Sequence, residues 1–199
     1  MIMEQTYSKN YFEKYATLSL LDILNIQENH IIQADCPDLQ IPYLNYGIEV
    51  TQALTPEEAV ADKKKQLYCQ LNMNPFNSFQ EDIDFLKWKI LDALKRKEEK
   101  SKHYLQFQKN GLYIFTHCYS FNKEDILACF ENYSIHNSFY QYIYFNCVTH
   151  IYCLSTQTLD IQTYSYSIDQ LITMNNQSLE YEKTCHKKRR KIIIPNQSQ

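Results

Sequence analysis

Apolar positions recur along the chain with two different periods, one typical of helices and one typical of strands. In residues 8–24 they recur every three or four positions, which predicts an amphipathic helix. A second predicted helix has an apolar stripe of Ile83, Leu86, Ile90 and Leu94. We interpret the charged segment 95–102 as the solvated end of this helix. Other stretches alternate between apolar and polar residues, as half-buried strands do.

Two capping signals predict where helices begin. Thr55 and Glu58 form a capping box around a proline at the first helical position, which predicts a helix running to about Leu71. Ser78 and Glu81 form a second box ahead of the Ile83 stripe.

The remaining segments complete an alternation of helices and strands. Asn122 caps a short helix, and residues 168–174 predict a short final one. The predicted strands cover residues 30–35, 38–44, 48–50, 112–120, 139–154 and 158–167. Because the two kinds of element mix without a βαβ repeat, we expect an α/β fold with a central mixed β-sheet flanked by helices.

The size and composition fit one globular domain followed by a tail. The chain has 199 residues, of which 44% are hydrophobic and 22% charged. We expect one domain over residues 1–183 and a basic, polar tail over residues 184–199. No apolar run is long enough to cross a membrane, and the polar N-terminus lacks a secretory core. We therefore expect a cytoplasmic protein, whose oligomeric state the sequence leaves open.

Cysteines, glycines and charge restrict the classes of function. The seven cysteines are scattered without a CxxC pair, so we interpret them as reduced and mostly buried. A zinc site built from Cys147, Cys153 and a histidine is a weaker alternative, since the spacing matches no usual template. With two glycines the chain can hardly form a phosphate-binding loop or a nucleophile elbow. The net charge of −3 argues against a nucleic-acid coat protein, although local basic patches can still bind phosphates.

A proline–aspartate pair is followed by an acid on the next predicted strand. Pro37 and Asp38 come first, and eleven residues after Asp38 the chain reads Glu49, Val50, Thr51. This pattern resembles the motif of the PD-(D/E)XK nuclease superfamily, which has the restriction-endonuclease-like fold. In that family a helix precedes the motif, and a helix and further strands follow it, as in the order predicted here.

The resemblance implies metal-dependent hydrolysis of phosphodiester bonds, with DNA as the expected substrate. Two neighbouring carboxylates repel each other, and a divalent cation relieves the repulsion. We therefore expect Asp38 and Glu49 to bind Mg²⁺ or Mn²⁺, and the resemblance adds the carbonyl of Val50 as a third ligand. Such an ion polarises the phosphate and activates a water for attack.

The motif departs from the family at Thr51, where the family carries a lysine. The threonine hydroxyl can bond a water or a phosphate oxygen but has no charge, and Gln52 could assist it if the strand bulges. Alternatively a lysine could reach back from the following helix, as migrated lysines do in some relatives. We name Lys63 as the catalytic candidate, and Lys64 and Lys65 as phosphate contacts.

Further candidates lie outside the motif. Glu13 on the first predicted helix is an additional acid, since some relatives use a glutamate there. His117 could act as a proton shuttle at a strand end, but His117 and His150 are more simply interpreted as satisfied core histidines. The basic segment of the tail supplies nucleic-acid contacts at Lys187, Lys188, Arg189 and Arg190.

Simpler interpretations compete with this one. Asp38 can form an Asx turn, Glu49 can be a solvated strand residue, and residues 63–65 can be a solvated helix face. Asp35 competes with Asp38, but residues three apart on an extended strand face opposite sides, and we favour Asp38. A second class of function keeps the nuclease fold without catalysis, as a nucleic-acid-binding or protein-interaction module.

Overall fold

The computed structural model describes residues 7–55 and 82–192, with side chains as far as Cys185. The helix expected from Thr55 to Leu71 and the capping box at Ser78 lie outside the described residues. The Ile83 stripe forms a helix whose N-cap is Asp82.

A seven-stranded sheet runs through the molecule, and its strands are arranged in sequence order. Strands β3, β4 and β5 are parallel, and each of the other neighbouring pairs is antiparallel. The central mixed sheet expected from the sequence is therefore confirmed. The strands are β1 (Ile32–Gln33), β2 (Leu39–Ile41), β3 (Tyr46–Gln52), β4 (Lys109–Phe115), β5 (Tyr142–Asn146), β6 (His150–Ser155) and β7 (Ile161–Ser165).

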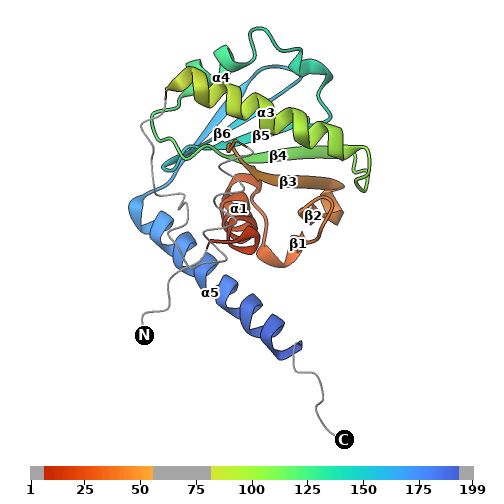
Figure 1. The fold of residues 1–199 in the computed structure, drawn as a ribbon, viewed down its shortest axis with the longest axis vertical. Helices are drawn as coiled ribbons and strands as arrows, with labels where there is room; N and C mark the ends of the chain where they lie inside the picture. Colours follow the sequence, from red (N-terminus) through yellow and green to blue (C-terminus); the bar gives the residue numbers. More distant parts are fainter. Residues whose placement is uncertain (1–6, 56–81, 193–199) are drawn as a thin grey trace, which may run out of the picture.

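Two helix layers cover the sheet, as Figure 1 shows. Helices α1 (Lys9–Leu24) and α5 (Ile168–Ile192) lie side by side on one face. Helices α3 (Ile83–Ser101) and α4 (Lys123–Cys129) cover the other face. Each layer encloses its own apolar core, so the central strands of the sheet are buried on both sides. Three short 3₁₀ helices complete the described chain: η1 (Glu28–His30), η2 (Pro42–Leu44) and η3 (Ile135–Asn137).

The parallel strands explain why α3 and α4 share one face. A parallel pair needs a crossover connection, and a helix normally provides it. Helix α3 lies in the connection from β3 to β4, and α4 lies in the connection from β4 to β5. Asn122 caps α4 through a capping box with Asp125, as the sequence predicted for Asn122.

Several element boundaries differ from the expectation, and three of the differences change the topology or the length of an element substantially. The strand expected over 139–154 is two strands, β5 and β6, joined by a tight turn in which Val148 has a φ of 66°. The strand expected over 30–35 is shorter and consists only of β1, because the 3₁₀ helix η1 includes His30. The short helix expected over 168–174 continues as α5 to Ile192, and its end projects beyond the sheet (Figure 1).

Candidate metal and phosphate site

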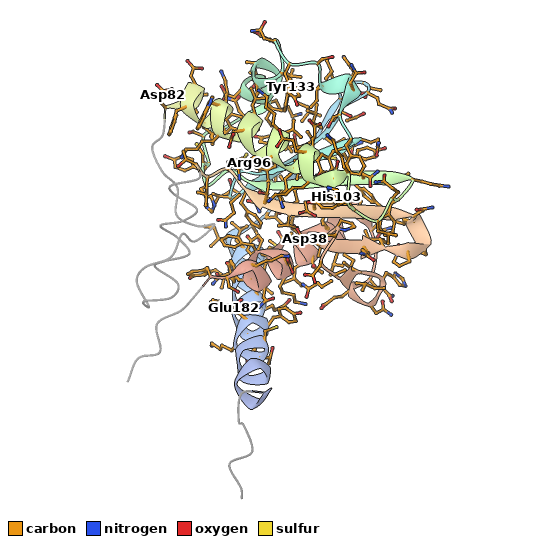
Figure 2. All side chains as sticks on the ribbon, turned by 45° about the vertical axis from the view of Figure 1, so that its right-hand side comes forward. Asp38, Asp82, Arg96, His103, Tyr133 and Glu182 are labelled. Carbon is orange, nitrogen blue, oxygen red and sulfur yellow. The ribbon has the colours of Figure 1, made fainter. Side chains whose placement is uncertain are left out.

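Asp38 is held against strand β3 by a backbone hydrogen bond. It lies directly before β2 and is 2% exposed. The amide of Val50 donates to Asp38 Oδ2 over 2.8 Å, which fixes the carboxylate beside the residue that follows Glu49. Figure 2 labels Asp38 in the region between helix α1 and the strands.

Gly47 allows the segment before Asp38 to approach the strand. A Cβ atom at Gly47 would lie 2.6 Å from Pro37 Cγ and 2.6 Å from Phe107 Cδ2. Both distances are far inside van der Waals contact, so a larger residue would push the proline away from β3. The glycine thereby fixes where the proline–aspartate pair lies relative to the Glu49 strand.

Glu49 lies on the opposite face of β3 from Val50 and points toward helix α3. It is 4% exposed. Lys97 Nζ lies 2.5 Å from Glu49 Oε1, and the Tyr104 hydroxyl donates to the same oxygen over 3.0 Å. The second oxygen, Oε2, is buried and accepts no hydrogen bond from the described residues. A buried carboxylate oxygen without a partner is costly, so this atom indicates a place for a cation or a donor.

Helix α1 contributes a third acid and a second lysine. Glu13 is 6% exposed, and Lys9 lies one turn before it. Lys9 Nζ is 2.9 Å from Asp38 Oδ1 and 3.2 Å from Glu13 Oε1. Asp35 is exposed and lies 3.9 Å from the same ammonium. Asp38 is therefore the buried acid of that pair.

The charge of Asp38 affects the pKa of each of the two buried glutamates. Burial raises the pKa of Glu13 to about 7, and the charge of Asp38 adds to the increase while Lys9 opposes it. Burial also raises the pKa of Glu49; Lys97 partly offsets this effect, and Asp38 adds to it. Burial lowers the pKa of Lys9, but its contacts with Asp38 and Glu13 outweigh burial and raise it overall. Asp38 therefore interacts electrostatically with both Glu13 and Glu49, and we call these three acids the acidic site.

The donor set of the acidic site suits a hard divalent cation. Mg²⁺ and Mn²⁺ prefer carboxylate oxygens, and Glu49 Oε2 is a buried oxygen with no hydrogen-bond donor. The described residues contain no preformed group of three or more side chains arranged as metal ligands. Two ammonium groups, those of Lys9 and Lys97, lie against the carboxylates instead.

Of the other predicted site residues, Thr51 lies near Glu49, Gln52 lies on the opposite face of β3, and the side chains of the rest are not described. Thr51 is half-buried and follows Glu49 on the same face of β3. Gln52 faces the α1 layer, where its Oε1 lies 3.0 Å from Nε2 of His117. Lys63, Lys64 and Lys65 lie outside the described residues. Of Lys187, Lys188, Arg189 and Arg190 only the backbone is described, as part of α5.

The histidine and cysteine candidates lie in other surroundings. His117 is buried, stacks on Phe115 and packs edge-on against Phe12, as a core histidine does. Cys147 belongs to the core under α3 and α4, whereas Cys153 belongs to the core under α1. These two thiols lie on opposite faces of the sheet and cannot share a zinc ion, so the alternative zinc site is wrong.

Lys97 and Tyr104 are the functional candidates that the sequence analysis missed. We interpreted the charged segment 95–102 as a solvated helix end. Lys97 lies three positions after Leu94, so it continues the buried stripe of α3 toward the sheet. Extending the stripe by one turn would have pointed to Lys97, whereas Tyr104 follows the helix and carries no periodic signal.

Comparisons with known proteins add no family to this picture. No protein-family model matches the chain, and no curated protein or solved structure is significantly similar to it. Within residues 7–55 and 82–192, no helix has the length and apolar character needed to cross a membrane.

Proposed function

We propose that the protein is a Mg²⁺- or Mn²⁺-dependent nuclease of the PD-(D/E)XK type that hydrolyses phosphodiester bonds, with DNA as its substrate. The observation that carries the proposal is a set of buried acids around Asp38: Glu13 shares the Lys9 ammonium with Asp38, and the charge of Asp38 raises the pKa of Glu49. The three acids come from three separate segments, and all are buried. The ammonium groups of Lys9 and Lys97 compensate these acids in the structure, and a divalent cation would compensate them in the same way.

The order of the elements around the acids supports the resemblance. Helix α1 carries Glu13 and precedes the antiparallel pair β2–β3, which positions Asp38 and Glu49. Helix α3 follows, and then β4 pairs in parallel with β3. This is the succession of helix, motif strands, helix and further strands that the resemblance implies.

Lys97 can replace the lysine that the motif lacks at Thr51. It reaches the acidic site from α3, a helix that follows the motif strands, and contacts Glu49 directly. We assign it the role that we had expected of Lys63. A fixed ammonium group beside the carboxylates can bind a phosphate oxygen and stabilise the charge that develops on it.

The remaining roles follow from the contacts. Asp38 and Glu49 would hold the metal ion, with Glu13 beside Asp38, and the ion when bound supplies Lewis-acid activation of the phosphate and of a water. Tyr104 orients Glu49 by donating to Oε1, and the amide of Val50 orients Asp38. The carbonyl of Val50 as a further ligand stays a prediction. The basic end of α5, residues 187–191, is the expected contact for the nucleic-acid backbone.

A cleavage assay with single- and double-stranded DNA and RNA, in Mg²⁺ and in Mn²⁺, tests the proposal. We expect Asp38→Asn and Glu49→Gln each to lower the cleavage rate about 100-fold or more, because metal activation contributes several kcal/mol. Glu180→Gln is the matched control, since it removes an exposed carboxylate from α5. Full cleavage by both site variants would refute the assignment. No cleavage by the wild type on any substrate would favour the module without catalysis.

A further inference from the structure

Lys9 contacts the carboxylate oxygen of Asp38 that accepts no backbone hydrogen bond from the described residues. Asp38 Oδ2 accepts the Val50 amide, so Oδ1 is the oxygen open to another partner. Lys9 Nζ lies 2.9 Å from that oxygen and also contacts Glu13 Oε1. The ammonium group therefore lies where a cation shared by Glu13 and Asp38 would have to lie.

The two lysines of the acidic site differ in how freely they can leave it. The Lys97 side chain is 18% exposed and lies under α3. The Lys9 side chain is 60% exposed and extends from the first turn of α1. A long, exposed lysine side chain can rotate into solvent at little cost in packing. Lys9 is consequently the ammonium group that can exchange with another cation.

We propose that Lys9 is an internal counter-ion that competes with the divalent cation for the acidic site. In the metal-free protein it compensates Glu13 and Asp38, and it swings out when the metal binds. This inference rests on the metal site of the proposed function. A buried carboxylate oxygen cannot keep an ammonium contact and a metal bond on the same side, so occupancy by Lys9 lowers the apparent metal affinity by the fraction of molecules that are open.

Calorimetric titration of the full chain with Mn²⁺ tests the competition. Lys9→Met keeps the length of the side chain and removes its charge. We expect it to bind Mn²⁺ about fivefold or more tightly than the wild type, since couplings of this kind usually exceed that factor. Lys183→Met removes an exposed, ion-paired lysine from α5 and should stay within about twofold of the wild type, because it is screened from the site.

The titration separates the inference from the proposed function. If the wild type binds Mn²⁺ and Lys9→Met binds it equally or more weakly, Lys9 is no competitor, while the nuclease proposal stands. If neither protein binds Mn²⁺, both proposals fail.

Thermal unfolding with and without metal gives a second readout. A purely structural lysine would change the melting temperature equally in both conditions. Without metal, Lys9→Met should melt below the wild type, because Glu13 and Asp38 lose their counter-ion. With saturating Mn²⁺ the difference should shrink or reverse, since tighter binding adds more stability. An equal difference in EDTA and in Mn²⁺ would overturn the competition.

Discussion

At the scale of single residues, the function proposed here depends on where a few charges lie relative to strand β3. Glu49 and Thr51 project from one face of the strand, and Lys97 approaches that face from α3. The sequence suggested the acids because their spacing follows a known motif. It indicated only that Lys97 continues the buried stripe of α3, because the contact between Lys97 and Glu49 is set by the tertiary fold.

The lysine assignment predicts a rescue. Lys97→Met should lower cleavage about 100-fold, because it removes a fixed cation beside the reacting phosphate. Adding Thr51→Lys to this variant places an ammonium group two residues from Glu49 on the same face, so it should restore part of the rate. Thr51→Lys alone should crowd Lys97 and give no gain. Single-turnover cleavage rates of the three variants check this, and a double variant no faster than Lys97→Met would argue against the assignment.

The cysteines should differ sharply in reactivity. Burial raises the pKa of Cys129 and of Cys147 to about 12, and that of Cys153 to about 11, which suppresses their thiolates at pH 8. Cys36 is exposed. Mass spectrometry after brief alkylation of the folded protein should therefore find Cys36 modified well before these three. Labelling of Cys147 as fast as Cys36 would mean that the strand β5 end is not packed as described.

At the scale of elements, helix α3 couples the sheet to the acidic site. Its buried stripe packs on the sheet, and its last turns bring Lys97 to Glu49. The stripe was predictable because it is apolar and periodic. The start of the helix is set by Asp82, whose Oδ1 accepts from the amides of Asp84 and Phe85.

Removing this cap should lower the free energy of unfolding without changing the residues of the acidic site. Asp82→Ala leaves the first-turn amides without an acceptor and should lower the free energy of unfolding by about 1 kcal/mol. Asp82→Asn retains a capping oxygen and serves as the control, with a smaller loss. Urea unfolding followed by circular dichroism measures both. A loss for Asp82→Asn as large as that for Asp82→Ala would show that charge, and not capping, is what matters.

Two elements were mispredicted for reasons that the side chains explain. The turn between β5 and β6 contains Val148 at a φ of 66°, a conformation that β-branched residues rarely adopt, so the sequence shows no turn signal. Helix α5 buries Ser178 and Glu182 along with Leu171 and Met174. Glu182 accepts a hydrogen bond from Ser8, which offsets the cost of burying its carboxylate. As polar residues on the buried face, Ser178 and Glu182 interrupt the apolar period that would have predicted the full helix.

At the scale of the whole molecule, the fold brings acids from distant segments together between two helix layers. Antiparallel pairing of β2 with β3 places Asp38 beside Glu49, and α1 returns over the same region with Glu13. The sequence predicted the mixed sheet and the flanking helices, because those follow from periodicity. The partners of each acid required the three-dimensional arrangement.

The tyrosine-rich cores predict an alkaline limit to stability. Burial raises the pKa of Tyr46 and Tyr144 well above 10 and that of Tyr133 to about 12. Above a pH of about 10 the unfolded chain loses protons that the folded chain keeps, so the free energy of unfolding falls as the pH rises. Tyrosinate absorbance at 295 nm should rise together with the loss of circular dichroism. Complete ionisation of the tyrosines in a protein that stays folded would contradict the described packing.

The central claim is that Asp38 and Glu49 hold a metal ion, with Glu13 beside Asp38, and anomalous diffraction from crystals soaked in Mn²⁺ tests it most directly. We predict an anomalous peak within bonding distance of the Asp38 and Glu49 carboxylates, with the Lys9 ammonium group turned away from Asp38. The peak should vanish in Glu49→Gln crystals soaked under the same conditions. A soaked wild-type crystal with Lys9 still bound between Glu13 and Asp38, and no peak beside them, would contradict the account.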